Sequence, residues 1–140
     1  MVPMRHRVAA LIERDGQLLV ARQRARGSSG RQDGALYRTP PGGGIEADET
    51  PVDAVIREVR EEVGLTVTAA VFVARVEYPS GSTEIYEVQV EPGEPVLGVD
   101  PEIECECPRL VGLEWVPAPD RHVWNSEEAV HALRAEITDL

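Results

Sequence analysis

The feature that most constrains this chain is a helix with clear ends that directly follows a run of glycines. Thr50 is a good N-cap, Pro51 stands at the first helical position, where its missing N–H costs nothing, and Asp53 fills the acidic third position. Gly64 supplies the left-handed residue at which helices commonly stop. The pattern predicts an α-helix over residues 51–63.

The predicted helix has an apolar stripe and an acidic face beside it. The stripe, which we expect to dock the helix on a sheet, consists of residues at helical spacing: Val52, Val55, Ile56, Val59 and Val63. Glu58, Glu61 and Glu62 stand at i, i+3 and i+4 and therefore share one face. Three carboxylates so close repel one another unless a cation lies among them, and hard divalent cations prefer oxygen ligands. A solvated acidic surface is the competing interpretation.

The glycine run and the helix together resemble the Nudix box. That box reads G-x5-E-x7-R-E-U-x-E-E-x-G-U, with U aliphatic, and every specified position is met here by Gly43, Glu49, Arg57, Glu58, Val59, Glu61, Glu62, Gly64 and Leu65. The lead-in at residues 37–44 and the late run at residues 112–117 also resemble segments of many family members. Asp48 is a departure, because Gly commonly precedes the first box Glu, and it puts the local turn geometry in question.

The resemblance implies a hydrolase of nucleoside diphosphates linked to another group, such as a nucleotide sugar, a dinucleotide or an NTP. It also implies an α/β/α sandwich with a mixed β-sheet, as one domain over residues 1–140. Arg57 and Glu49 are implied to form an orienting ion pair. The implied ligands of Mg²⁺ or Mn²⁺ are a backbone carbonyl near Gly43 and the box carboxylates Glu58, Glu61 and Glu62.

A general base must deprotonate the attacking water, and it needs only hydrogen-bond reach. The box offers Glu62 or Glu61 for this role. A late acidic loop offers three more candidates: Glu102, Glu104 and Glu106. We favour a box residue as the base and Glu102 as an additional carboxylate at the metal, while a merely solvated acidic loop stays open.

Substrate contacts are expected from residues 22–34, which are rich in Arg, Gly and Ser and lack apolar periodicity, as in a loop. An acidic protein needs local positive charge to bind an anionic substrate, and Arg makes bidentate contacts to phosphate. Arg22, Arg24 and Arg26 are therefore the candidate phosphate contacts, and Tyr37 is a candidate for stacking on a base. A solvated loop far from the site is the alternative.

Composition limits the partners. A net charge of −11, from 25 acidic and 14 basic residues, disfavours long nucleic acids and leaves a small nucleotide as the expected substrate. No apolar run approaches a membrane span, so we expect a cytoplasmic protein without membrane contact, with a homodimer left open. Cys105 and Cys107 stand too close for an ordinary disulfide framework and lack a second pair for zinc.

The remaining pattern is mostly strands, which with two helices indicates an α/β arrangement. Asp15 and Gly16 separate two apolar runs and predict a β-hairpin. The expected strands are residues 8–12, 18–21, 36–39, 67–77, 83–90 and 110–116, and a closing helix is expected at residues 126–137.

Two other functions remain open. A non-catalytic ligand-binding or regulatory module of the same fold is disfavoured, because such modules usually lose box carboxylates and all are intact here. An isomerase on the same scaffold would need a further acid/base pair, typically with a Cys, and the two cysteines leave it open.

Overall fold

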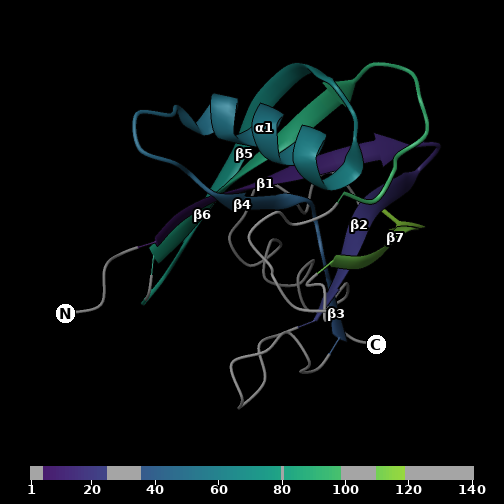
Figure 1. The fold of residues 1–140 in the computed structure, drawn as a ribbon. Coiled ribbons are helices and arrows are strands. Elements are labelled where there is room, and N and C mark those ends of the chain that lie inside the picture. Colours follow the sequence, from purple (N-terminus) through teal and green to yellow (C-terminus); the bar gives the residue numbers. More distant parts are fainter. Residues whose placement is uncertain (1–4, 25–35, 80, 99–109, 119–140) are drawn as a thin grey trace.

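The computed structural model describes residues 5–24, 36–79, 81–98 and 110–118 of the chain. Within these residues one helix, α1 (Pro51–Val63), lies across one face of a sheet (Figure 1). The strands are β1 (Arg5–Arg14), β2 (Gln17–Arg24), β3 (Leu36–Thr39), β4 (Gly42–Gly44), β5 (Val67–Tyr78), β6 (Gly81–Val90) and β7 (Leu110–Pro117).

The strands form one mixed sheet in the order β3-β2-β1-β6-β5, to which β4 adds on β1 and β7 adds on β2. β1 runs parallel to β6, and the other pairings are antiparallel. This arrangement confirms the predicted α/β class with a mixed sheet. The predicted helix at residues 126–137, which would supply the third layer of the sandwich, lies outside the described residues.

The β1–β2 connection is the predicted hairpin. Asp15 and Gly16 have φ values of 52° and 76°, and Arg14 pairs with Gln17 across the turn. Positive φ at both central residues matches the twist of a two-residue hairpin, and Gly tolerates that region without cost. Because the turn is this tight, β1 and β2 are fixed in register as neighbours near the centre of the sheet.

Side chains alternate between the two faces of the sheet along each strand, and each face carries a buried apolar cluster. On the face covered by α1 the core contains Val8, Ala10, Ile12, Leu19, Ala54, Val55, Val59, Val63, Leu65, Tyr86 and Val88. The opposite face carries Leu11, Leu18, Val20, Ala74, Val76 and Ile85. The box helix packs against the core on one of these faces, which fixes the positions of its side chains.

The loop predicted at residues 22–34 begins too early. Residues 22–24 continue β2, where they pair with residues 36–38 of β3, so the chain leaves the sheet after Arg24 and not at Arg22. The Arg-rich composition suggested a loop, but pairing with β3 and β7 outweighs local propensity, as is common in sheets.

No helix within the described residues is long and apolar enough to cross a membrane.

Candidate active site

The ends of α1 follow the sequence prediction. Thr50 is extended (φ −76°, ψ 157°), and its Oγ1 accepts a hydrogen bond from the Asp53 amide at 3.1 Å. Gly64 is left-handed (φ 70°, ψ 18°), and its N–H donates to the Arg60 carbonyl at 3.1 Å. Both ends are thus fixed by local capping bonds, which sets where each box residue falls along the helix.

The rotation of α1 differs from the prediction. Val52 and Ile56, which we placed in the apolar stripe, are 40% and 38% exposed. Glu58 and Glu62, at 9% and 2% exposure, lie in the buried face instead, together with Ala54, Val55, Val59 and Val63. The helix is turned so that two carboxylates face inward. A carboxylate buried in this way needs hydrogen-bond partners or a cation.

The glycine run provides part of that environment. Residues 42–44 form β4, which pairs with β1. A Cβ at Gly42 would overlap the Val8 carbonyl, and a Cβ at Gly43 would stand 2.5 Å from Glu58 Oε1. Glycine is needed here because the backbone approaches β1 on one side and the Glu58 carboxylate on the other. The positive φ lies instead at Asp48 (64°), the residue that departs from the box pattern.

Arg57 connects the acidic residues of the site. Its guanidinium binds Glu49 with two hydrogen bonds, from Nε at 2.8 Å and from Nη2 at 2.9 Å. Nη1 donates to Glu58 at 2.9 Å and to Glu61 at 3.3 Å, and Nη2 also donates to the Gly44 carbonyl at 2.9 Å. The structure therefore brings together Glu49, Arg57, Glu58 and Glu61, in the bidentate geometry that suits a guanidinium.

This network perturbs the ionisation of both partners. The hydrogen bonds from Arg57 hold the pKa of Glu49 below its ordinary value of 4.5 against the opposing effect of burial. The same bonds, together with those to Glu58, raise the pKa of Arg57 above its ordinary value. Glu49 is therefore an anion and Arg57 a cation at neutral pH.

The two last box carboxylates differ in environment. The Glu62 side chain lies against β4, where its Oε1 accepts a hydrogen bond from the Gly42 amide at 2.8 Å. The Glu61 side chain is half exposed, at 50%. One carboxylate is thus fixed by backbone, and the other is open to water.

A hard divalent cation needs several oxygen ligands close together. Within the described part of the chain, no three Asp, Glu, His or Cys side chains gather into a metal-binding group. Arg57 stands among the carboxylates instead, so a guanidinium takes the place that the sequence pattern suggested for a metal. Arg57 lies within ion-pair distance of four carboxylates, those of Glu46, Glu49, Glu58 and Glu61, so carboxylates outnumber this guanidinium. That all-oxygen donor set, with the bare Cα of Gly43 beside Glu58, fits a hard divalent ion.

The candidate substrate contacts are only partly placed. Arg22 follows Val20 on the sheet face opposite α1, where its guanidinium lies against Gly112 of β7 and its buried Nε finds no partner among the described residues. Arg24 and Tyr37 lie in β2 and β3. Their side chains, and the whole of Arg26, Glu102, Glu104, Glu106, Cys105 and Cys107, lie outside the described residues.

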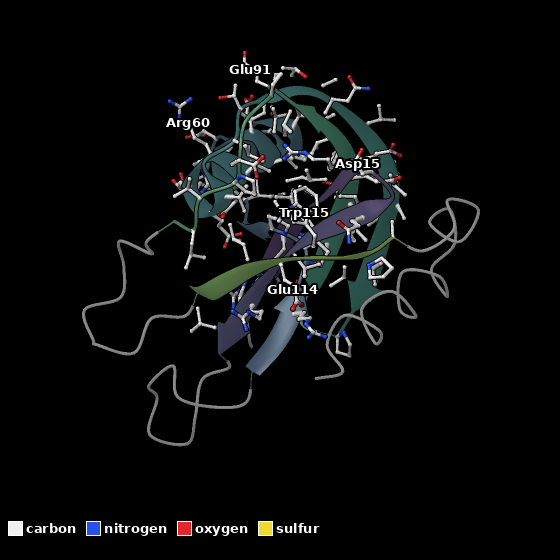
Figure 2. All side chains as sticks on the ribbon, turned by 90° about the vertical axis from the view of Figure 1, so that its right-hand side faces the viewer. Asp15, Arg60, Glu91, Glu114 and Trp115 are labelled. Carbon is white, nitrogen blue, oxygen red and sulfur yellow. The ribbon has the colours of Figure 1, made fainter. Side chains whose placement is uncertain are left out.

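β7, which pairs with β2 beside Arg22, carries one partner of an ion pair and an aromatic residue. Glu114 contacts Arg38 of β3 at 2.6 Å, while Trp115 packs against the core beneath α1 and Arg14 lies 5.1 Å from its ring centroid. Figure 2 shows Glu114 and Trp115 together on this strand. Arg38 is the cross-strand partner of Arg22 and forms an ion pair with Glu114. These residues lie on the sheet face opposite α1.

A groove of about 520 Å³ opens beside the start of α1. Its lining includes Glu49 and Glu46 together with Arg7 and Arg75, but none of Glu58, Glu61 or Glu62. The groove therefore reaches the Glu49 end of the network, while Glu58, Glu61 and Glu62 lie outside its lining.

Sequence reasoning missed two features of the described residues. Gln23 is a polar residue on β2 that is only 2% exposed. The segment of residues 95–98 returns to the end of α1, where Gly98 donates to the Glu62 carbonyl. The sequence offers only a general indication of this contact, because the last carbonyls of any helix need hydrogen-bond partners outside it.

Comparison with known proteins identifies relatives. The NUDIX domain family model matches residues 3–133. An RNA pyrophosphohydrolase of Gluconacetobacter diazotrophicus is 42% identical over 65 residues, which is 45% of this chain and 38% of that protein. A CTP pyrophosphohydrolase of Escherichia coli is 42% identical over 67 residues, 48% of this chain and 46% of that protein. The matches thus span less than half the length of either curated relative.

Solved structures show the same fold. The crystal structure of a MutT NUDIX hydrolase from Burkholderia pseudomallei superposes with a TM-score of 0.65 at 24% identity, and the match covers 91% of this chain and 95% of that one.

Proposed function

Because the chain belongs to the NUDIX domain family, we propose that it is a pyrophosphohydrolase that uses Mg²⁺ or Mn²⁺ to cleave the phosphoanhydride bond of a small nucleotide. The observation that carries this proposal is the pair of inward-facing carboxylates, Glu58 and Glu62, beside the guanidinium of Arg57. A surface helix that were acidic only for solubility would keep such side chains in water, since burying them is costly.

The proposed metal ligands are Glu58, Glu61 and Glu62, with a backbone carbonyl near Gly43 and with Glu102. When bound, the ion neutralises the diphosphate oxygens and stabilises the charge that develops as the phosphoryl group is transferred. The crowding of several carboxylates around the single guanidinium of Arg57 supports this assignment, because a second cation relieves repulsion among carboxylates.

The residues around the ligands then have distinct tasks. Arg57 holds Glu49 and Glu58 in one orientation through its hydrogen bonds. The Gly42 amide holds Glu62. Glu61 is the more accessible of the two box candidates for the general base, because its side chain is half exposed and a base must reach the attacking water.

The first substrate class we propose is a free nucleoside triphosphate. Two relatives are named CTP pyrophosphohydrolase and RNA pyrophosphohydrolase, and the net charge of −11 disfavours binding a long nucleic acid. Arg22, Arg24 and Arg26 are proposed to contact the phosphates, and Tyr37 to stack on the base. The position of Arg22 on the sheet face opposite α1, with its guanidinium against Gly112, makes Arg22 a weaker candidate for this contact.

The test is a substrate panel with metal control. The purified chain with Mg²⁺ is incubated with CTP, the other triphosphates, nucleotide sugars, dinucleotides and a 5′-triphosphorylated RNA, and the products are resolved by ion-exchange chromatography. We expect cleavage that stops in excess chelator and returns with Mg²⁺ or Mn²⁺. Turnover that continues in chelator excludes the metal assignment, and tight nucleotide binding without any cleavage identifies a binding module instead.

A further inference from the structure

The end of α1 is held by a segment that comes from elsewhere in the chain. An α-helix leaves its last four carbonyls without partners inside the helix. Here Gly64 donates to the Arg60 carbonyl at 3.1 Å, Val96 to the Val63 carbonyl at 2.8 Å and Gly98 to the Glu62 carbonyl at 2.8 Å. We call residues 95–98 the helix-end segment. Three of the last four carbonyls of α1 are thus satisfied, two of them by this segment.

The contact at Gly98 is backbone against backbone. A Cβ at this position would overlap the Glu61 carbonyl oxygen and would stand 2.8 Å from the Glu61 carbonyl carbon and 3.2 Å from the Glu62 Cα. These three atoms belong to the main chain of a helix, so no flexible side chain can move aside to make room. Only glycine lets the segment lie this close.

The two residues that Gly98 contacts, Glu61 and Glu62, carry box carboxylates. Glu62 is held twice, at its carbonyl by the Gly98 amide and at its side chain by the Gly42 amide. Among the described residues, the Glu61 side chain contacts Arg57 alone, at 3.3 Å, so its placement depends on the path of its backbone. Loosening the last turn of α1 would therefore move both carboxylates.

We propose that Gly98 is a positioning residue of the metal site: through the helix-end segment it fixes the backbone of Glu61 and Glu62 and so sets where their carboxylates stand. This inference rests on the proposed function, because it assigns the two carboxylates to the metal. Groups that orient metal ligands commonly change metal affinity or activity by about 10- to 100-fold when they are removed.

The first experiment measures Mn²⁺ binding to the full chain without substrate, by electron paramagnetic resonance of the free ion. We expect Gly98→Ala to raise the dissociation constant by about tenfold or more, the range for loss of a ligand-orienting group. The matched control is Val96→Ala, because the Val96 side chain is 66% exposed and the variant keeps the amide that binds Val63. With Mn²⁺ saturating, the KM of Gly98→Ala should stay near wild type, since the variant leaves the nucleotide contacts in place.

The second experiment uses the wild type alone and therefore does not depend on the folding of a variant. In the metal-free protein, the amide protons of Val96 and Gly98 should exchange with solvent as slowly as those of the last turn of α1. Rapid exchange at Gly98 would overturn the inference.

The outcomes separate the two claims. Equal Mn²⁺ affinity of folded Gly98→Ala and wild type overturns the positioning role and leaves the proposed function intact. Mn²⁺ binding that weakens in the variant, in a protein that cleaves no nucleotide of the panel, supports the positioning role and refutes the proposed function. A wild type that binds no Mn²⁺ refutes both.

Discussion

Replacing Arg57 by Ala tests the central electrostatic claim about this site. The substitution removes all the hydrogen bonds from the guanidinium to Glu49, Glu58, Glu61 and the Gly44 carbonyl at once. Glu49 and Glu58 then remain in place with side chains that are only 13% and 11% exposed, and the cation that compensated them is lost. The metal-free protein should be clearly destabilised.

The magnitude follows from the burial of this network. Breaking a fully buried ion pair costs roughly 3–5 kcal/mol, whereas an exposed pair contributes about 0–1 kcal/mol. The Arg57 side chain is 21% exposed, which places it nearer the buried limit. We therefore expect a loss of about 2–3 kcal/mol, which for a domain of this size lowers Tm by on the order of 10 °C.

The pH dependence gives a second, independent signature. The pKa of Glu49 is lower in the folded protein than its ordinary value of 4.5, so its pairing with Arg57 stabilises fully above that value and is lost as pH falls through the lowered pKa. The pKa of Arg57 is raised, so its own contribution would be lost only at strongly alkaline pH. The Tm difference between wild type and Arg57→Ala should be constant near neutral pH and should narrow below about pH 4.5.

The assay is thermal unfolding followed by circular dichroism in chelator, with Arg60→Ala as the matched control. Arg60 lies on the same helix, and its side chain points outward, away from the sheet (Figure 2). This control removes one positive charge without touching Glu49 or Glu58 and should shift Tm little, as surface substitutions usually do. If Arg57→Ala unfolds at the same temperature as Arg60→Ala, the guanidinium is solvated and the network does not stabilise the site.

The remaining predictions concern the box carboxylates and the Arg-rich segment. Glu61→Gln and Glu62→Gln should each lower kcat by about 10²-fold or more, as expected for lost electrostatic stabilisation, while Tm in chelator holds or rises; near-normal rates in both would mean that these carboxylates are not used. Arg24→Ala combined with Arg26→Ala should raise the KM for the best nucleotide more than it lowers kcat, and the rise should shrink with added salt. An unchanged KM at low salt would place the phosphate contacts elsewhere.

Much of the fold follows from local sequence signals. The hairpin at Asp15 and Gly16, and the helix between Thr50 and Gly64, depend on turn and capping chemistry that acts over a few residues. Such features can be predicted because the atoms that decide them are neighbours in the chain. The end of β2 was misplaced for the opposite reason, since residues 22–24 are extended by pairing with β3 and β7, whose positions the local sequence does not reveal.

The side-chain arrangement of the site was also not predictable from local sequence. Spacing places Glu58, Glu61 and Glu62 on neighbouring turns, but a hydrophobic pattern treats every Glu as an outward-facing residue, and so it assigned Val52 and Ile56 to the core. The helix is instead rotated toward β4, where the Gly42 amide and the guanidinium of Arg57 receive the carboxylates. Those partners are distant in sequence or depend on the rotation itself. A pattern that breaks the hydrophobic rule at Glu58 and Glu62 therefore marks the residues whose burial requires compensation, and compensation of this kind is where function is to be sought.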